Sequence, residues 1–448
     1  MSGLSQKKSR TAIVIGGGFG GIAAALRLRG LGYHVTLFDR LSRLGGKAQV
    51  YVREGFRYDA APTMITHPHL FNELFQLFNR SLSDFVKLVP LQTGTKFYFP
   101  DGSTFQHGAA IDDTLLEIAK INKKDCQGYL KLLEKTDADR ASSAHSLFKW
   151  IPTPIKSTED LIATYIENPH VREALAHQAQ LLNGNPTKVY EWRPTGLFFP
   201  TGGVGSLVDA FQQLMEINGI DIQLNKTVKK IHVENGAVKT IELQDGLTYA
   251  CDTLVVNSDP AYVYKHLIDR SFQGKWKDKK LDKLHFSQSA FILYFGTKKT
   301  YKEVAQHSVL IGEVPVYLHR PTSIDPSFAP NKCDSFYASM LVPNLKEPID
   351  WCHAGAHERE RILSLLEKHL LPDLRNQIIQ DFFMTPKDFQ NSYLSLYGSG
   401  YGTNEKFPHV SAEIDHLYFV GAGTEPGPGL CGVLNSAKIV ENLIRETL

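Results

Sequence analysis

Near the start of the chain, two runs of apolar positions enclose a glycine-rich turn and a helical pattern. The run AIVI at residues 12–15 has no polar position, which is typical of a strand buried on both faces of a parallel sheet. Residues 22–29 (IAAALRLR) favour a helix, and residues 34–38 (HVTLF) return to a strand pattern. Strand, helix and strand within about 30 residues predict a βαβ unit with parallel strands.

The rest of the chain mixes helical spacing with strand-like runs. Apolar residues recur at helical spacing in residues 70–78, 112–133, 160–179, 358–370 and 434–446. Apolar or aromatic strands are predicted at residues 220–224, 253–257, 286–296, 337–342 and 417–420. Two hairpins are predicted from the turn pairs Asp101-Gly102 and Asn235-Gly236. This order predicts an α/β fold with parallel strands near both ends and additional α+β structure between them.

The turn after the first strand carries glycines at the spacing of a dinucleotide-binding loop. Gly16 permits a tight strand-to-helix turn, Gly18 leaves room for a pyrophosphate, and Gly21 allows the helix to pack closely on the strand. The helix N-terminus offers free N–H groups to the phosphates. Asp39, at the end of the second strand, is placed to accept hydrogen bonds from a ribose. We therefore predict dinucleotide binding; the alternative is a glycine-rich turn without a ligand.

Composition narrows the class of protein. The 448 residues exceed what one simple core holds, so we expect more than one lobe. A net charge of +2 gives no reason to expect nucleic acid as a partner. The five cysteines lack a C-x-x-C pair, which argues against a disulfide framework and a zinc site and fits a reducing compartment. No apolar run reaches the ~18–20 residues that span a bilayer, and the short polar start does not read as a signal peptide.

Several further motifs occur along the chain in an order that is typical of one protein family. A second glycine pair beside a cation, RLGGK at residues 43–47, follows Asp39, and further segments are APTMIT, FPTGGVGSLVDA, LNKTVKKI, MTPKDF and LYFVGAGTEPGPGLCGVLNSAK. Together they resemble the bacterial-type phytoene desaturases, which are FAD-dependent carotenoid desaturases of the amine-oxidase-like flavoproteins. The resemblance covers nearly the whole length. It implies FAD, a Rossmann-like FAD-binding domain and an inserted α+β substrate domain with an apolar tunnel.

The resemblance divides the chain into five segments. The FAD-binding domain is expected at residues 1–105, 195–260 and 407–448, and the substrate domain at 106–194 and 261–406. The cofactor-binding residues that we expect come from glycine loops, strand ends and the last helix: Gly16, Gly18, Phe19, Gly20, Gly21, Asp39, Arg40, Gly45, Gly46, Lys47, Pro62, Thr63, Met64, Val228, Asn257, Gly421, Ala422, Gly423, Gly432 and Val433.

This chain departs from the family pattern near the substrate and the flavin. The first insertion is short around residues 128–160, and Phe407-Pro408-His409-Val410 replaces a usual polar segment. Glu425 stands where the family commonly has His, and Cys431 where it has Pro. Glu425 is the candidate catalytic residue, as a proton carrier at the flavin; the alternative is a loop carboxylate bonded to backbone amides. Cys431 is expected to be a buried loop thiol.

Three further polar or apolar segments have open interpretations. His67 and His69 either approach the substrate or have a surface or capping role. His319-Arg320 either binds an anionic group or forms a solvated pair on a loop. Residues 148–155, which include Trp150 and Ile151, either dip into a bilayer or link the two lobes.

The expected function is desaturation of a long apolar polyene such as phytoene, with hydride transfer to FAD and reoxidation by a quinone or oxygen. The expected location is cytoplasmic, with peripheral attachment to a membrane surface. One alternative is an amine-oxidase-like or tailoring oxidoreductase for a smaller, polar substrate. Another is a flavin-binding protein without turnover.

Overall fold

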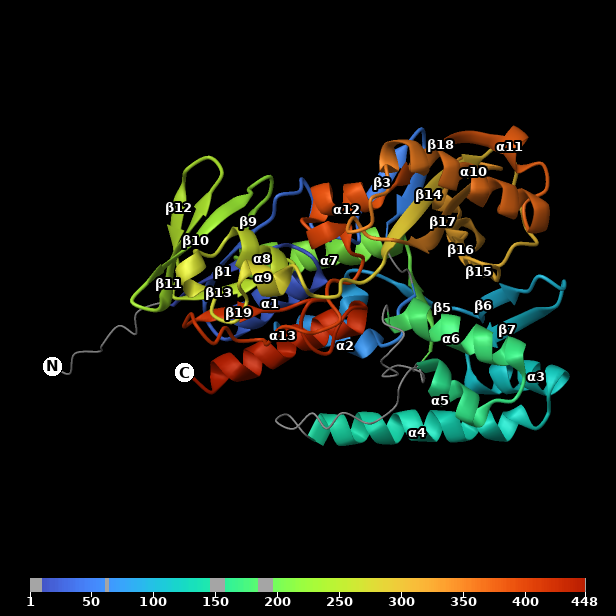
Figure 1. Cartoon of the computed structure of the whole chain (residues 1–448), viewed down its shortest axis with the longest axis horizontal. Helices are drawn as coiled ribbons and strands as arrows, with labels where there is room; N and C mark the ends of the chain where they lie inside the picture. Colours follow the sequence, from blue (N-terminus) through green and yellow to red (C-terminus); the bar gives the residue numbers. More distant parts are fainter. Residues whose placement is uncertain (1–9, 61–63, 146–157, 184–195, 448) are drawn as a thin grey trace.

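The computed structural model describes residues 10–60, 64–145, 158–183 and 196–447. It is elongated, with two sheet-centred lobes side by side (Figure 1). One lobe contains both ends of the described chain together with residues 203–266, and the other contains two separate stretches, residues 93–183 and 289–384. The cavities that matter for function lie where the lobes meet.

The first lobe is built on a parallel five-stranded sheet in the order β19-β13-β1-β2-β9. Its strands are β1 (Thr11–Ile15), β2 (His34–Phe38), β9 (Asp221–Gln223), β13 (Thr253–Val256) and β19 (Leu417–Phe419). Alternate residues of β1 serve two cores. Ala12 and Val14 pack with the helices α1 (Phe19–Gly30), α2 (Pro68–Gln76), α7 (Gly203–Ile217) and α13 (Leu430–Arg445). Ile13 and Ile15 face the opposite side. The predicted parallel βαβ unit is confirmed.

The opposite face of this sheet is covered by an antiparallel three-stranded sheet and a short helix. The strands are β10 (Val228–Glu234), β11 (Ala237–Leu243) and β12 (Thr248–Ala250), and the helix is α8 (Pro260–His266). Asn235 and Gly236 form the predicted tight turn, both with positive φ, of 52° and 79°.

The second lobe contains a seven-stranded sheet in the order β18-β14-β17-β16-β15-β6-β7. Its strands are β6 (Thr93–Tyr98), β7 (Thr104–Gly108), β14 (Ser289–Thr297), β15 (His307–Leu310), β16 (Val316–His319), β17 (Asp334–Val342) and β18 (Ile378–Met384). All neighbours are antiparallel except β15 and β6. Phe291, Leu293 and Phe295 pack against α10 (Trp351–His369), while Ile292 and Tyr294 face a second core. That second core includes α3 (Ile111–Ile121), α4 (Asp125–His145), α5 (Thr158–Tyr165) and α6 (Pro169–Asn183).

The remaining described elements are two short strand pairs and several short helices. The antiparallel pairs are β3 (Val50–Arg53) with β4 (Phe56–Asp59), and β5 (Leu88–Pro90) with the distant β8 (Phe198–Pro200). The short helices are η1 (Leu82–Asp84), η2 (Arg270–Phe272), α9 (Asp278–Leu281), η3 (Pro321–Ser323), η4 (Pro326–Phe328), α11 (Leu374–Gln377), α12 (Pro386–Tyr393) and η5 (Leu396–Gly398).

The chain leaves the first lobe at an earlier residue than the sequence suggests. The β6–β7 hairpin belongs to the second sheet, so the chain crosses into that lobe before Thr93 rather than after residue 105. The Asp-Gly turn predicts the hairpin itself, but nothing local in a hairpin says which sheet it joins. Here the parallel pairing of β6 with β15, more than 200 residues away in the sequence, decides it.

Two helix starts differ from what the local sequence suggests. Ser206 is a residue type that could cap a helix at residues 207–215. Helix α7 begins instead at Gly203, so Ser206 lies inside the first turn, where its hydroxyl contacts the carbonyls of Thr201 and Gly203. The carboxylate of Asp59, from β4, accepts the Val204 N–H instead. Helix α13 begins at Leu430 and not at residue 434. A capping group supplied from a distant strand is invisible to local sequence patterns.

Candidate functional site

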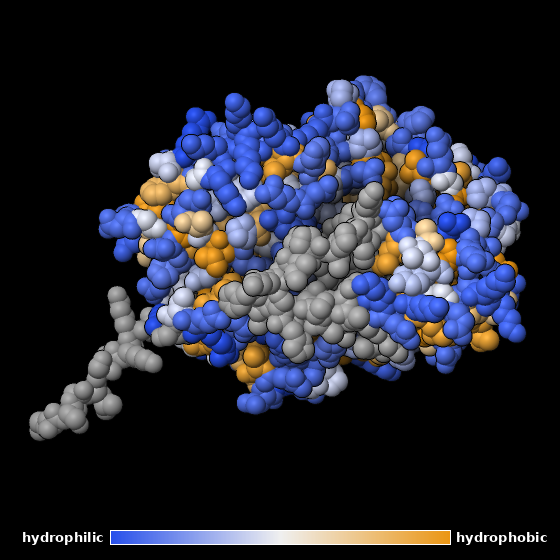
Figure 2. Space-filling view, turned by 60° about the horizontal axis from the view of Figure 1, so that its bottom comes forward, coloured by the Kyte–Doolittle hydropathy of each residue, from blue (hydrophilic) through white to orange (hydrophobic). Residues whose placement is uncertain are grey.

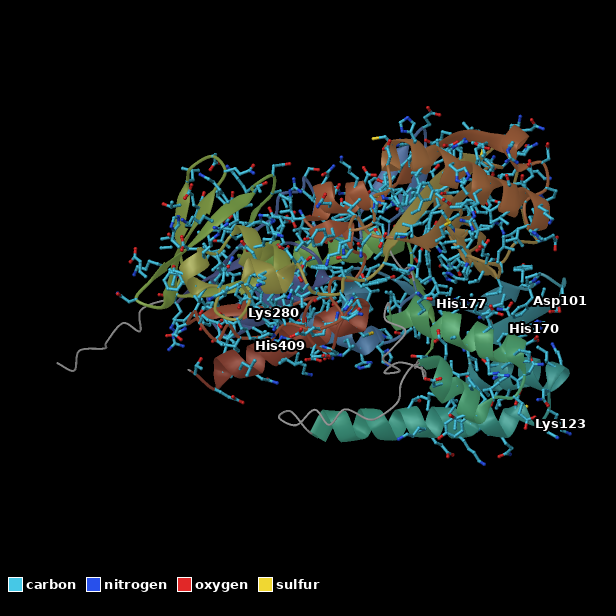
Figure 3. All side chains as sticks on the ribbon, viewed as in Figure 1. Asp101, Lys123, His170, His177, Lys280 and His409 are labelled. Atoms are coloured by element: carbon cyan, nitrogen blue, oxygen red, sulfur yellow. The ribbon has the colours of Figure 1, made fainter. Side chains whose placement is uncertain are left out.

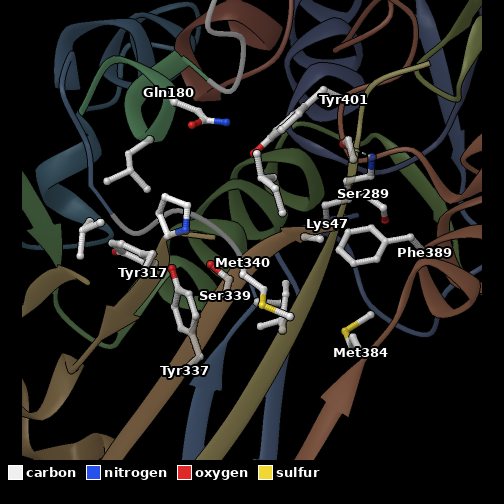
Figure 4. Close-up of a pocket in the computed structure, with 18 of the residues that line it drawn as sticks. Lys47, Gln180, Ser289, Tyr317, Tyr337, Ser339, Met340, Met384, Phe389 and Tyr401 are labelled. Carbon is white, nitrogen blue, oxygen red and sulfur yellow. Dashed lines mark hydrogen bonds between the residues drawn. The ribbon is translucent and has the colours of Figure 1, made fainter. Parts of the chain in front are cut away.

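Two cavities meet between the lobes. We call the first the cofactor cavity, which lies at the carboxyl ends of β1, β2 and β13. The second, the apolar cavity, lies against the seven-stranded sheet (Figure 4). Lys47, Tyr393, Gly400 and Tyr401 line both cavities. These four residues therefore form the junction between them.

The glycines of the first loop place no side chain between the loop backbone and the cofactor cavity. Gly17 carbonyl accepts from the Gly45 N–H at 2.8 Å, so the two glycine loops lie side by side. A Cβ on Gly18 would lie 3.0 Å from the Asn257 side-chain nitrogen, and a Cβ on Gly46 would lie 3.0 Å from the Gly18 Cα. A side chain at either position would fill the space that a pyrophosphate needs.

Gly21 has a different task, as predicted. A Cβ there would lie 1.8 Å from the carbonyl oxygen of Gly16, behind the cavity wall. The residue therefore allows α1 to pack on the end of β1. The same helix is held by Arg27, which pairs with Glu441 of α13 at 2.6 Å and with Glu73 of α2 at 2.9 Å in the buried interface.

Asp39 is the acid at the end of β2. Its two carboxylate oxygens accept from the backbone N–H groups of Gly17, at 2.5 Å, and Leu41, at 2.7 Å. Burial raises the pKa of the Asp39 carboxyl, although the hydrogen bonds from Leu41 and Gly17 oppose this shift. Each oxygen retains acceptor capacity toward the cavity, which fits a ribose hydroxyl.

The N-terminus of α13 forms a further part of the wall of the cofactor cavity. Leu430 and Val433 line the cofactor cavity, and Gly429 precedes the helix with φ 94°. The preceding loop is fixed because the Gly421 N–H donates to the Ser436 hydroxyl at 2.8 Å. A 16-residue helix whose free N–H groups face the cavity favours negative charge there.

Most of the predicted cofactor residues line this cavity: Gly16, Gly18, Phe19, Gly20, Asp39, Arg40, Gly45, Gly46, Lys47, Val228, Asn257, Ala422, Gly423 and Val433. Gly21, Gly421 and Gly432 support the wall from behind. Met64 lines the apolar cavity instead. Pro62 and Thr63 lie outside the described residues.

Sequence reasoning missed the part of the wall that comes from the second lobe: Tyr393, Leu394, Ser395, Gly400, Tyr401 and Gly402. The run GSGYG at residues 398–402 was the available signal, because so much glycine suggests backbone close to a ligand. It also missed Lys226, Thr227, Ser258, Asp259 and the loop 428–430.

The apolar cavity is lined mainly by carbon. Its hydrophobic residues are Ala60, Met64, Leu181, Ala290, Ile292, Val309, Val314, Pro315, Met340, Leu341, Met384 and Phe389. The lining also includes polar side chains: Tyr317 and Tyr337 from the sheet, and His177 and Gln180 from α6 (Figures 3 and 4). Such a lining suits a long hydrocarbon better than a small charged substrate.

The candidate catalytic residue Glu425 does not line either cavity. It is half-buried in the loop before α13, and its charge acts on nearby His409. Cys431 is buried in the first turn of α13, with its sulfur 3.6 Å from Nδ1 of His67. His67 is buried at the N-cap position of α2, whereas His69 in the first turn of that helix is exposed, so a surface role is wrong for His67 alone.

The expectation for His319-Arg320 is also wrong. His319 is buried at the end of β16, and Arg320 pairs with buried Asp334 at 3.0 Å. This internal ion pair replaces both the anion site and the solvated loop pair. The segment 148–155, proposed to touch a membrane, lies entirely outside the described residues, Trp150 and Ile151 included.

Comparison with known proteins identifies the family. Residues 19–440 match the sequence model of the flavin containing amine oxidoreductases. The chain belongs to this family. The lycopene-forming phytoene desaturase of Pseudescherichia vulneris is 31% identical over 493 aligned positions, covering 98% of this chain and 100% of the relative. The neurosporene-forming enzyme of Rhodobacter capsulatus is 31% identical over 491 positions, covering 97% and 94%.

Solved structures agree on the fold. An oxidoreductase from Methanosarcina mazei superposes with a TM-score of 0.71, at 18% identity, covering 96% of this chain and all of the other. A putrescine oxidase variant gives a TM-score of 0.67 at 12% identity, covering 98% and 99%. The predicted α/β fold with a Rossmann-like FAD-binding domain is thus confirmed.

Membership confirms the prediction of an FAD-dependent oxidoreductase of the carotenoid desaturase type. The cofactor cavity fits FAD, since it combines a bare glycine loop, an acid for the ribose and a helix N-terminus beside the junction. FAD, when bound, supplies a two-electron acceptor for a hydride. The aligned length of 493 positions against 448 residues means that at least 45 positions of the first relative have no counterpart here.

Proposed function

We propose that this protein desaturates a long apolar carotenoid precursor of the phytoene kind. The observation that carries the proposal is the junction, where the same four residues line both the apolar cavity and the cofactor cavity. A substrate carbon chain in the first cavity would lie against FAD in the second. The named activities of the curated relatives, which include lycopene-forming and neurosporene-forming phytoene desaturases, support the same substrate class.

The protein's own groups would position the substrate more than react with it. The sheet face that carries Ile292 and Val309 would supply apolar contact along the chain of the polyene. Phe389 and Met384 close the wall near the junction. Exclusion of water by these residues would protect a reduced cofactor and hold the reacting carbons near it.

The experiment is anaerobic flavin reduction. FAD-loaded protein is mixed with liposomes that contain phytoene, and flavin bleaching is followed together with product absorbance in the visible. Stoichiometric bleaching with a coloured product is expected. Bleaching by soluble amines without any polyene would favour the smaller, polar substrate, and no bleaching with either would favour a flavin-binding protein without turnover.

The membrane and the electron acceptor belong to this proposal as well. In the described part of the chain, no helix is long and apolar enough to cross a bilayer. A surface on α3 and α4 exposes Leu116 (64%), Ile121 (39%) and Leu130 (37%). Exposed lysines of the same region include Lys123, which Figure 3 shows at the α3–α4 connection, with Lys124 and Lys131. Apolar groups beside cations suit the surface of an anionic bilayer.

We call these residues the α3–α4 surface. The face in Figure 2 shows hydrophobic residues only in small patches among hydrophilic ones, so attachment would be shallow. Contact with a bilayer would give an apolar polyene a route to the apolar cavity without crossing water. A membrane quinone or oxygen would then accept the electrons from the reduced cofactor.

A further inference from the structure

The junction between the cavities contains three titratable side chains among the described residues: Lys47, Tyr393 and Tyr401. Lys47 follows the second glycine pair and lines both cavities. Its Nζ donates to the carbonyl of Gly400 at 2.7 Å. It also lies 5.9 Å from the centre of the Phe389 ring. The amino group is therefore held at the place where cofactor and substrate meet.

Formation of a C=C bond requires a hydride and a proton to leave neighbouring carbons. Bound FAD would supply the acceptor for the hydride, so a second group is needed to take the proton. We propose that the amine of Lys47 accepts this proton, a role that rests on the proposed function. In this step the C–H electron pair becomes the new π bond, the hydride reduces FAD, and Lys47 changes from amine to ammonium.

The other junction groups are poorer acceptors. Burial raises the pKa of Tyr393 and of Tyr401, so both phenols stay protonated near neutral pH. A protonated phenol can donate a hydrogen bond but has no strong base to offer. Glu425 does not line either cavity.

The surroundings of Lys47 make its free amine accessible near neutral pH. Burial lowers the pKa of Lys47 to about 8, although the charge of Asp259 at the start of α8 opposes the shift. The groups that face it are Asp259, the Tyr393 phenol from the end of α12 and the Tyr401 phenol from the loop after η5. The diphosphate of bound FAD would act in the same direction as Asp259. An arginine, in contrast, cannot lose its proton in this range.

The test compares Lys47→Arg and Lys47→Ala with wild type. The anaerobic rate of flavin reduction by phytoene is measured per bound FAD between pH 6 and 10. Wild type is expected to slow by about tenfold per pH unit below the pKa of the amine. Both variants are expected to lose ~10²–10⁴-fold in rate and to lose this dependence. The exposed Lys239→Arg is the matched control and should retain wild-type behaviour.

Chemical rescue separates a proton acceptor from a merely positive or space-filling group. Small primary amines added to Lys47→Ala should restore part of the rate, increasingly so at pH values above their own pKa. Affinity for FAD, followed by flavin fluorescence, should change by only a few-fold in Lys47→Arg. A Lys47→Arg protein that reduces flavin within a few-fold of wild type, with the same pH dependence, contradicts the proposal.

A measurement without turnover covers variants that fail to fold or to bind FAD. Wild-type holoprotein is labelled with fluorodinitrobenzene, an apolar aryl reagent, at several pH values, and the Lys47 peptide is quantified by mass spectrometry. A labelling midpoint near pH 8 to 9 is expected, and a midpoint at the ordinary lysine value overturns the proposal. Absence of flavin reduction in wild type with any polyene would instead contradict the proposed function, and the lysine role with it.

Discussion

Gly18 and Gly21 are three positions apart in one loop, yet a side chain at each would meet different atoms. Gly18 has φ −72° and ψ 172°, which any residue adopts, so space alone reserves this position for glycine. Gly18→Val should therefore keep the fold and abolish FAD binding. The measurement is the ratio of flavin to protein absorbance, together with the thermal midpoint.

The matched comparison is Gly21→Ala, where the new Cβ would press on the Gly16 carbonyl at 1.8 Å. This variant should lose thermal stability whether or not FAD is present, because helix and strand must separate. Full flavin occupancy in Gly18→Val would contradict the assignment of the pyrophosphate to this loop.

Glu425 remains a prediction from the family resemblance. If it carries a proton, Glu425→Gln should retain FAD and lose ~10²–10⁴-fold in the rate of flavin reduction. Its absence from the walls of both cavities favours the other outcome, a rate within a few-fold of wild type and a lower thermal midpoint. Anaerobic flavin reduction per bound FAD distinguishes the two.

At the scale of elements, the α3–α4 surface can be tested directly. Replacing Ile121 and Leu130 by serine removes apolar area that would enter the bilayer and should weaken binding to anionic liposomes by about 3 kcal/mol, or roughly 100-fold. Cosedimentation at two salt concentrations measures it. Leu247→Ser is the control, since Leu247 is 52% exposed but lies next to β12 in the other lobe. Equal loss in the control would mean that binding is unspecific.

The segment around Trp150 gives a second, independent test of attachment. Trp150→Ser with Ile151→Ser should reduce partition into liposomes and activity on a polyene if this segment touches the bilayer. Unchanged partition in that double variant, together with loss in the α3–α4 variant, would place the contact on the helices alone.

How far the sequence predicts an element depends on where its partners lie. The parallel βαβ unit, the Asn235-Gly236 hairpin and most of the glycine-lined wall follow from residues close in sequence. The start of α7 does not, because its cap is Asp59 from a distant strand. The junction does not either, since Tyr393 and Gly400 reach it from the second lobe. Arg320 was misjudged for the same reason: its partner Asp334 occupies another strand.

At the scale of the molecule, buried histidines should make stability depend on acid pH. Burial lowers the pKa of His107 to about 4 and of His307 to about 3, from an ordinary value of 6.5, and holds the pKa of His319 well below that value. Between the lowered pKa values and the ordinary value of 6.5, these histidines bind protons only in the unfolded chain. The free energy of unfolding therefore falls as the pH falls below 6.5. At pH 5 the loss is about 2 kcal/mol for each histidine.

Urea unfolding at several pH values measures this effect. His307→Asn retains a polar atom near the Tyr317 hydroxyl, which Nδ1 of His307 contacts at 2.7 Å. The variant should show a pH slope smaller by about one proton, whatever its stability at pH 7. The exposed His285→Gln should leave the slope unchanged. An unaltered slope in His307→Asn would mean that His307 titrates normally in the folded protein.

The parallel sheet of the first lobe takes strands from near residue 11, from residues 221–256 and from residues 417–419. During synthesis, β1 and β2 leave the ribosome long before β19 and α13 exist. The part of the cofactor-cavity wall that α13 contributes therefore cannot form until almost the whole chain has been translated. By then the second lobe has already left the ribosome. Cofactor capture is accordingly a late event in the life of the nascent chain, and a ribosome stalled before residue 417 would display both glycine loops without a site that holds FAD.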